Sequence, residues 1–223
     1  LRSIIADVEV TVITGNCKAT AGHHRVHTVS RMDILGIIKA ISRCHILISG
    51  GGSLLQDVTS SRSLYYYLAV IRIAQWLHKP VMLYAQGIGP LIRTRARKAV
   101  RSVLQHVDLI TVRDEASRAE LAAIGVTKPP IEVTADAVLS INPVSLDRGQ
   151  TILAAAGVDM HRRCIGICVR DWKGMTHHQV EIAAAADALQ KKWDAQIVFI
   201  PMQFPDDIKA GTAIQQRMTG KAT

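Results

Sequence analysis

The sequence predicts an α/β fold with two Rossmann-like domains, each built on a doubly wound parallel sheet. Three observations lead to this fold class. Short apolar runs rich in β-branched residues alternate with longer amphipathic stretches. Most of the short runs are continuous hydrophobic stretches and do not alternate strictly between apolar and polar residues, which is typical of parallel strands buried on both faces. Hydrophobic residues make up 48% of the 223 residues, which is enough for a core and argues against a disordered chain.

The expected elements alternate along the chain. In its first part we expect strands at residues 8–13, 45–49, 81–85, 109–112 and 131–134. Between them we expect helices at residues 32–43, 63–78, 94–106 and 115–124. A second series has strands at residues 165–169 and 196–200 and helices at residues 177–193 and 206–218. Strands that alternate with helices of this length indicate a parallel sheet covered on both faces.

A break in this alternation separates the two expected domains. Turn-forming sequences occur at residues 142–143 and 147–149, followed by a short alanine-rich helical stretch. We therefore expect an N-terminal Rossmann-like domain at residues 1–147 that lacks its first strand. Residues 148–223 are expected to hold a linker and the start of an incomplete C-terminal Rossmann-like domain. Both ends of the chain are thus expected to be truncated.

The chain is basic, with 27 Lys and Arg against 18 Asp and Glu, a formal net charge of +9. The basic residues are dense only at residues 93–101, and aromatic residues make up only 4% of the chain. This composition argues against nucleic acid as a partner, because base stacking needs aromatic side chains. A solvated helix face, attraction to an anionic substrate and attraction to anionic lipid headgroups all remain open as explanations of the dense run.

Cysteine and histidine patterns indicate neither a disulfide framework nor a metal site. No Cys-x-x-Cys pair occurs, and Cys164 and Cys168 flank an apolar run, where we expect buried free thiols. Adjacent histidines diverge on a helix or strand, so neither His-His pair is expected to chelate a metal. The sequence contains no secretory signal and no run of 18 uncharged apolar residues. We expect a cytoplasmic protein in a reducing compartment.

A glycine-rich turn follows the expected strand at residues 45–49. It consists of Gly50, Gly51, Gly52 and Ser53, and is followed by Gln56 and Asp57. Ligands of open parallel sheets bind beyond the carboxyl ends of the strands. Successive backbone amides in such a turn can bind an anion, although the glycines can also simply form a tight turn. The spacing matches neither the dinucleotide fingerprint nor the Walker loop.

Polar residues also follow the next three expected strands. They are Gln86 with Gly87, then Arg113 with Asp114, and finally Asp136. A guanidinium at position 113 can hold a phosphate or carboxylate in two-pronged fashion. The alternative is a local pair between Arg113 and Asp114, with Asp114 as the N-cap of the following helix.

The second series of elements offers Arg170, directly after the expected strand at residues 165–169. An arginine at a strand end of each domain suits an anionic substrate bound between the domains. A structural ion pair of Arg170 with an acidic neighbour is the competing interpretation.

Taken together, these motifs resemble those of polysaccharide pyruvyl transferases, nearest to the bacterial cell-wall type. Residues 48–57 look like the family's segment Gly-Gly-Gly-x-Leu-Leu-Gln-Asp. The family's further motifs follow in the same order and spacing at residues 86–90, 112–117, 134–136 and 169–172. The resemblance covers most of the chain, from residue 8 to residue 206. It implies two facing Rossmann-like domains similar to those of GT-B glycosyltransferases.

The resemblance implies transfer of pyruvate from phosphoenolpyruvate to a sugar of a cell-wall or exopolysaccharide precursor, as a pyruvate ketal. Phosphoenolpyruvate is then the donor substrate, and no further cofactor is implied. The acceptor in cell-wall members is a lipid-linked saccharide, which implies peripheral contact with the cytoplasmic face of the inner membrane. Arg113 matches a family position proposed to hold the donor and is our candidate catalytic residue. The candidate substrate-binding residues are Gly50, Gly51, Gly52, Ser53, Gln56, Asp57, Gln86, Gly87, Asp136 and Arg170.

The sequence departs from the family pattern near both ends. The family's upstream Gly-Asn-x-Gly-Asp-Glu turn is not present, and the family's catalytic histidine belongs to a region beyond Thr223. We therefore expect these 223 residues alone not to catalyse the transfer. Two other functions fit the same architecture: a glycosyltransferase that uses a nucleotide sugar, and a non-catalytic module that binds saccharides or anions.

Overall fold

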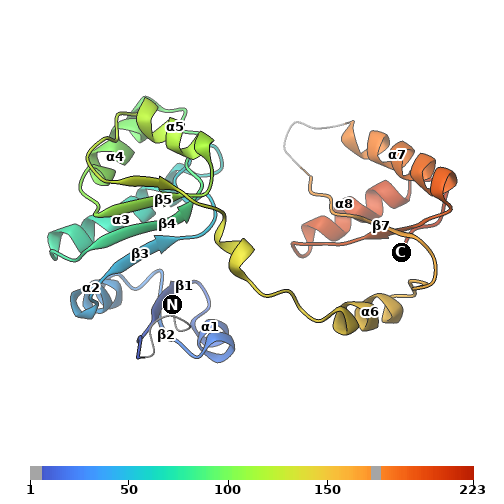
Figure 1. Ribbon diagram of the computed structural model, residues 1–223, viewed down its shortest axis with the longest axis horizontal. Helices are drawn as coiled ribbons and strands as arrows, with labels where there is room; N and C mark the ends of the chain where they lie inside the picture. Colours follow the sequence, from blue (N-terminus) through green and yellow to red (C-terminus); the bar gives the residue numbers. More distant parts are fainter. Residues whose placement is uncertain (1–6, 172–176) are drawn as a thin grey trace. The chain divides into compact units, whose positions relative to one another are not determined.

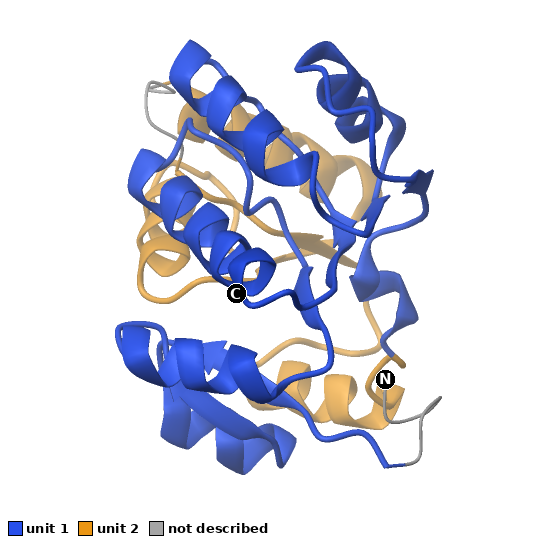
Figure 2. Cartoon of the chain, turned by 90° about the vertical axis from the view of Figure 1, so that its left-hand side faces the viewer, with its two compact units in different colours: residues 1–141 blue, residues 142–223 orange. Residues whose placement is uncertain are grey.

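The structure, a computed structural model, describes residues 7–171 and 177–223. The chain divides into two compact units, residues 1–141 (unit 1) and residues 142–223 (unit 2), coloured separately in Figure 2. The division falls after Ile141, whereas the turn-forming sequences predict a first domain that extends to residue 147.

Unit 1 consists of parallel strands that alternate with helices (Figure 1). Its strands are β1 (Thr11–Thr14), β2 (His27–Ser30), β3 (Leu47–Gly50), β4 (Val81–Gln86), β5 (Leu109–Val112) and β6 (Ile131–Val133). Its helices are α1 (Cys17–His24), α2 (Ile34–Arg43), α3 (Ser61–Trp76), α4 (Thr94–Leu104), α5 (Glu115–Ala123) and the short η1 (Ala137–Ser140). β1 pairs with β2, and a second sheet has the order β3-β4-β5-β6. The predicted α/β class is confirmed.

The core of unit 1 forms where the helices pack on the middle of the larger sheet. Leu83 of β4 and Ile110 of β5 are fully buried. α3 contributes apolar residues spaced three and four apart, which puts them on one face of the helix: Leu64, Leu68 and Ile71. The expectation that the strands are buried on both faces is wrong for β3, where alternate residues such as Ile48 are exposed.

α1 and β2 were not predicted from the sequence. α1 has no buried residue, so no apolar stripe marks it as a helix. Its start is nevertheless encoded locally, because the side chain of Asn16 accepts a hydrogen bond from the amide of Ala19 at 3.1 Å. β2 has the sequence His-Thr-Val-Ser, so no apolar run marks it as a strand.

Unit 2 repeats the alternation on a smaller scale. It contains α6 (Leu146–Ala155), β7 (Cys164–Ile167), α7 (His178–Trp193), β8 (Gln196–Phe199) and α8 (Asp206–Gln215). β7 and β8 are parallel. None of the helices described in either unit is long and apolar enough to cross a bilayer.

Two expectations for unit 2 are wrong. Residues 147–149 form part of the first turns of α6 instead of a loop, and Asp147 is favourable there because the helix N-terminus carries a partial positive charge. Cys164 and Cys168 are exposed instead of buried. The reason is that β7 pairs only with β8 in the described part of the unit. One edge of β7 is therefore left without a neighbouring strand to cover it.

Candidate functional site

The carboxyl end of β4 contains a bulge that shapes the candidate site. The register between β4 and β5 shifts between Leu83 and Gln86. Ala85 has a φ of +48° there, a region that non-glycine residues rarely adopt. The Thr111 hydroxyl accepts a hydrogen bond from the Ala85 amide at 2.7 Å and donates to the Leu83 carbonyl at 3.3 Å. The bulge therefore redirects the chain just before Gly87.

Arg113, directly after β5, is the centre of a polar cluster at this edge of the sheet. Its Nη2 donates to Oγ of Ser53 at 3.0 Å, and its Nη1 lies 3.1 Å from Oδ2 of Asp136. Its Nε donates to Oδ2 of Asp114 at 3.3 Å. The side chain is 33% exposed, so the guanidinium is fixed but still reachable from solvent. We call this set, completed by Gly87, the Arg113 cluster: Ser53, Gly87, Arg113, Asp114 and Asp136.

Gly87 lies directly against the guanidinium. A Cβ at this position would be 2.6 Å from Oγ of Ser53 and 2.7 Å from Cζ of Arg113. The amide of Gly87 also donates to the Gly52 carbonyl at 2.9 Å, which joins the loop after β4 to the glycine turn. The absence of a side chain at position 87 is therefore what lets Arg113 reach Ser53.

The carboxyl groups of the cluster are held in their charged form. Hydrogen bonds from the side chain and amide of Ser117 lower the pKa of Asp114, burial opposes them, and Arg113 lowers it further. The amide of Val138 lowers the pKa of Asp136, again opposed by burial and assisted by Arg113. Asp114 is the N-cap of α5, so helix capping and pairing with Arg113 occur together.

Apart from the Ser53 hydroxyl, the glycine turn after β3 meets the cluster through its backbone. Gly51 and Gly52 have φ values of +83° and +62°, which favour glycine. A Cβ at Gly50 would lie 3.2 Å from the carbonyl oxygen of Tyr84, so β3 and β4 approach closely there. The Gly51 amide donates to that carbonyl at 3.3 Å. This amide therefore joins the end of β3 to β4 and is not directed at a ligand.

Gln86 lies behind the cluster. Its side chain is fully buried, and its Nε2 donates to Oγ of Ser49 at 3.1 Å. Its Oε1 has no hydrogen-bond partner among the residues that the structure describes. The Gln86 carbonyl accepts from the amide of Arg113 at 3.2 Å. The geometry gives Gln86 a supporting position beneath Arg113 and no direct access to a substrate.

Gln56 and Asp57 lie at the far end of the loop and do not join the cluster. The two carboxylate oxygens of buried Asp57 accept from the amides of Ile92 and Arg93, each at 2.8 Å. Burial raises the pKa of Asp57, but these amides and the charge of Arg93 together bring it below its usual value. Gln56 accepts from two backbone amides of its own loop. Both residues hold the chain in place.

Arg170 belongs to unit 2, where it follows β7. Its Nε lies 3.4 Å from Oδ1 of Asp207, a buried carboxylate that also accepts from the amides of Met202 and Gln203. Burial raises the pKa of Asp207, and the two amides and Arg170 outweigh it and lower the pKa. The ion pair with an acidic neighbour is thus present, and about half of the Arg170 side chain remains exposed. Trp172 of the same motif lies outside the described residues.

A histidine–carboxylate pair also follows β7. Nε2 of His178, at the start of α7, lies 3.1 Å from Oδ1 of Asp171, which also accepts from Nε2 of Gln179 at 2.9 Å. Such a contact orients an imidazole. The sequence offered no local signal for it, because Asp171 and His178 are seven positions apart.

Three polar residues that support the site were not among the predicted site residues: Ser49, Thr111 and Ser117. The Ser117 hydroxyl accepts from the amide of Ile88 at 2.9 Å and so fixes the loop after β4. Ser117 and Thr111 are buried. For Thr111, which stands between Ile110 and Val112, a lone polar residue within an apolar run was the available signal, because buried hydroxyls are almost always hydrogen-bonded.

Comparisons with known proteins add a family and a fold. The sequence model of the polysaccharide pyruvyl transferase family matches residues 1–209. No curated protein sequence matches significantly. Two solved structures of Anabaena HepE are similar in fold, one in complex with UDP and glucose and the other with UDP-glucose.

The likeness to HepE extends over most of this chain. The first structure has a TM-score of 0.58 at 10% identity and covers 93% of this chain and 57% of HepE. The second has a TM-score of 0.57 at 11% identity, with coverages of 90% and 55%. The chain thus spans little more than half the length of these structures. At this identity the likeness shows the fold alone, and it agrees with the predicted GT-B-like class.

Proposed function

Because this chain belongs to the polysaccharide pyruvyl transferase family, we propose that it transfers pyruvate from phosphoenolpyruvate to a sugar of a cell-wall or exopolysaccharide precursor. The product is a cyclic pyruvate ketal, and phosphate is released. The observation that carries the proposal is the Arg113 cluster, in which a partly exposed guanidinium is held at the carboxyl edge of a parallel sheet. Phosphoenolpyruvate presents a carboxylate and a phosphate, and a guanidinium binds either group with two parallel hydrogen bonds.

The proposed chemistry begins with a proton added to the methylene carbon of phosphoenolpyruvate, which leaves the adjacent enol carbon electrophilic. One sugar hydroxyl forms a bond to that carbon and loses its proton. A second hydroxyl of the same sugar then displaces phosphate, gives its proton to the departing phosphate and closes the ring. In total the C=C π bond and one C–O bond break, and one C–H bond and two C–O bonds form. A fixed cation beside the phosphate stabilises the charge of the leaving group. We assign this role to Arg113.

The remaining parts of the proposal concern the acceptor and the location. The acceptor is a lipid-linked saccharide, and the protein acts in the cytoplasm. Arg170 is a second candidate cation for an anionic substrate, since about half of its side chain is exposed beside buried Asp207. The glycine turn contributes through its backbone conformation, which sets the position of Ser53 next to Arg113.

Substitution of Arg113 tests the proposal. Arg113→Gln is expected to weaken binding of phosphoenolpyruvate by about 100-fold, because a charged, two-pronged contact is lost. Arg113→Lys keeps the charge but not the two-pronged geometry. Its affinity for phosphoenolpyruvate should lie between those of the wild type and Arg113→Gln. Arg118→Gln on α5 is the matched control, because Arg118 is exposed and only five positions away. Isothermal titration calorimetry measures the affinities, and equal affinity in wild type and Arg113→Gln would refute the assignment.

A glycosyltransferase that uses a nucleotide sugar is the second candidate, favoured by the fold that this chain shares with HepE, whose structures hold UDP with glucose or UDP-glucose. Titration of the same protein with UDP-glucose separates the two functions. Binding of UDP-glucose without binding of phosphoenolpyruvate would replace the first proposal by the second. Binding of a saccharide with neither donor would indicate a non-catalytic module.

A further inference from the structure

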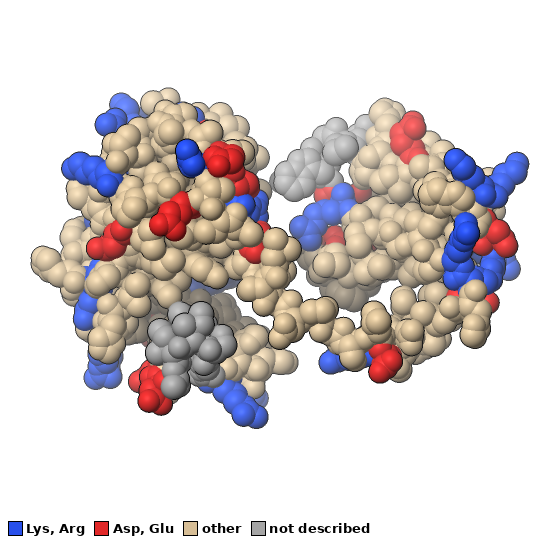
Figure 3. Space-filling model, viewed as in Figure 1, with Lys and Arg blue, Asp and Glu red and all other residues tan. Residues whose placement is uncertain are grey.

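The excess positive charge of the chain is concentrated in one segment of unit 1. Between Asp57 and Asp108 the sequence has no acidic residue and eight basic ones: Arg62, Arg72, Lys79, Arg93, Arg95, Arg97, Lys98 and Arg101. This segment contributes +8 of the formal net charge of +9, so the rest of the chain is almost neutral. Figure 3 shows basic side chains projecting from the upper left edge of unit 1, where α4 lies in Figure 1.

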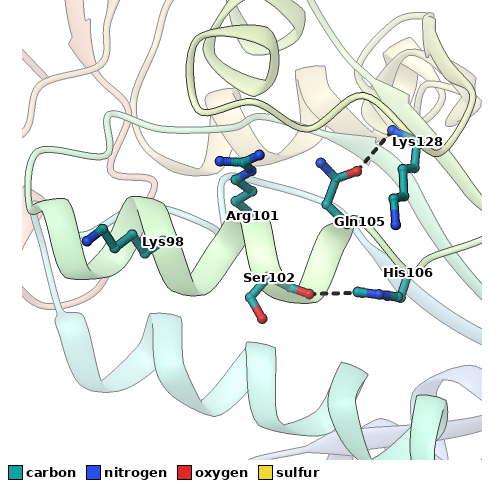
Figure 4. A pocket seen from close by; sticks show the side chains of 6 residues that line it. All are labelled: Lys98, Arg101, Ser102, Gln105, His106 and Lys128. Atoms are coloured by element: carbon teal, nitrogen blue, oxygen red, sulfur yellow. Dashed lines mark hydrogen bonds between the residues drawn. The ribbon is translucent and has the colours of Figure 1, made fainter.

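The segment forms α3, β4 and α4, and its two helices lie side by side. Nη2 of Arg72 on α3 donates to the Ser102 hydroxyl on α4 at 3.0 Å. Nε2 of Gln75 donates to the carbonyl of Val103 at 2.9 Å. Figure 4 shows α4 with Lys98 and Arg101, and α3 running alongside. Because the helices are joined in this way, their outward side chains form one surface.

Helical spacing places basic and aromatic side chains on the outside of this pair. On α3, Arg62, Tyr65 and Trp76 are exposed at spacings of three and eleven positions, which keeps them on one side of the helix, and Tyr65 and Trp76 are 45% and 73% exposed. On α4, exposed basic residues recur every three positions. We call this surface the α3–α4 basic face and define it by Arg62, Tyr65, Trp76, Arg95, Lys98 and Arg101.

The four cations of the α3–α4 basic face have no acidic partner among residues 7–171 and 177–223. The segment forms two ion pairs within the described part of the chain, Arg93 with Asp57 at 3.9 Å and Arg97 with Glu120 at 3.1 Å. Neither pair involves a residue of the face. The positive charge of the face is therefore not neutralised within the described residues, and it is available to an outside anion.

A shallow groove extends the face toward the loop after α5. It is lined by Lys98, Arg101, Ser102, Gln105, His106 and Lys128 (Figure 4). Oε1 of Gln105 accepts from the amide of Lys128 at 3.0 Å, which ties this loop to α4. Lys128 therefore adds a further exposed cation beside the face.

We propose that the α3–α4 basic face is a docking surface for a membrane rich in anionic lipid headgroups. Unpaired cations spread over two adjacent helices are attracted to a surface of negative charge. Exposed tryptophan and tyrosine suit the boundary between headgroups and acyl chains, because each has an apolar ring and a polar atom. All four cations are exposed, whereas a site for one small anion would hold it among partly buried donors. The inference does not depend on the reaction proposed above.

Sedimentation with lipid vesicles tests the docking surface. The protein should bind vesicles of phosphatidylcholine mixed with phosphatidylglycerol, should not bind phosphatidylcholine alone, and should dissociate as the salt concentration rises. Each basic residue near an anionic surface contributes about fivefold in affinity, so the triple variant Arg95→Gln/Lys98→Gln/Arg101→Gln should bind about 100-fold more weakly. Thermal unfolding of the variant checks that it is folded.

The matched control is Lys191→Gln/Lys192→Gln/Lys209→Gln, which makes the same change of charge on α7 and α8 of unit 2. It should bind the anionic vesicles almost as the wild type does. Equal losses in the two triple variants, no binding to anionic vesicles, or equal binding to phosphatidylcholine alone would each overturn the proposal. Displacement from the vesicles by duplex DNA at equal phosphate concentration would also overturn it, in favour of a nucleic-acid surface. The assay contains no phosphoenolpyruvate or acceptor, so its failure would leave the proposed reaction standing.

Discussion

Among single residues, Gly87 decides whether the guanidinium of Arg113 fits beside the chain after β4. The atoms that an added Cβ would meet, Cζ of Arg113 and Oγ of Ser53, are ends of movable side chains. Gly87→Ala should therefore displace Arg113 and lower the affinity for phosphoenolpyruvate at least ~10-fold, while stability changes by less than about 1 kcal/mol.

Calorimetry and urea denaturation measure these two effects. Gly149→Ala in α6 is the control, because among the described residues no atom outside its own helix backbone and chain neighbours lies within 4 Å of the position that its Cβ would take. It should leave the affinity unchanged. If Gly87→Ala binds phosphoenolpyruvate as tightly as wild type, the close packing against Arg113 has no part in binding.

Asp57 is a residue whose charge stabilises the fold. Its pKa is lower in the folded protein than the ordinary value of about 3.9. The stabilisation is therefore present above pH ~4 and is lost as the pH falls through the folded-state pKa. Asp57→Asn should lower the free energy of unfolding at neutral pH by about 2 kcal/mol, since one of the two amides at Ile92 and Arg93 loses its acceptor.

Urea denaturation between neutral and acid pH measures this contribution. The difference in stability between wild type and Asp57→Asn should shrink as the pH falls below ~4. Asp206→Asn is the control, because that carboxyl is exposed, and its effect should stay within about 0.5 kcal/mol. A constant difference between wild type and Asp57→Asn at every pH would show that the charge of Asp57 contributes nothing.

At the level of elements, the bulge in β4 depends on one hydroxyl from β5. Thr111→Val keeps the shape of the side chain but leaves the buried amide of Ala85 without its acceptor. We expect a loss of about 1–3 kcal/mol in the free energy of unfolding and a weaker affinity for phosphoenolpyruvate, because the bulge positions Gly87. Thr111→Ser, which retains the oxygen, should lose less on both measures. A Thr111→Val variant as stable as Thr111→Ser would contradict the role of the hydroxyl.

At the level of the whole molecule, the two compact units are connected by an exposed segment. Every residue from 138 to 152 is exposed, and the segment carries apolar side chains such as Ile141 and Val144. Thermolysin cuts before apolar residues in accessible chain, so its first cleavage should fall at residues 141–146 and release two resistant fragments. Mass spectrometry identifies the cut, and Val144→Asp should slow it. First cleavage within α3 or β4 would contradict the division into units.

Local sequence patterns specify the type and order of most elements. The strand expected at residues 109–112 is β5 with the same bounds, and α4 begins at Thr94 as expected. The apolar periodicity and β-branched content that specify these elements act over a few residues. Two further features are likewise local: the positive φ values of Gly51 and Gly52, and the capping of α5 by Asp114. The glycine turn and the helix start could therefore be predicted without knowledge of the fold.

The candidate residues that contact one another could not be identified before the fold was known. Arg113 reaches Ser53 across 60 positions and Asp136 across 23, and both contacts depend on the pairing of β3 to β6. Asp57, in the same motif as Ser53, points inward to the chain before α4 instead. The physical reason is that strand register and the bulge at β4 set the direction of each side chain. Register arises from contacts between distant segments, which no local pattern specifies.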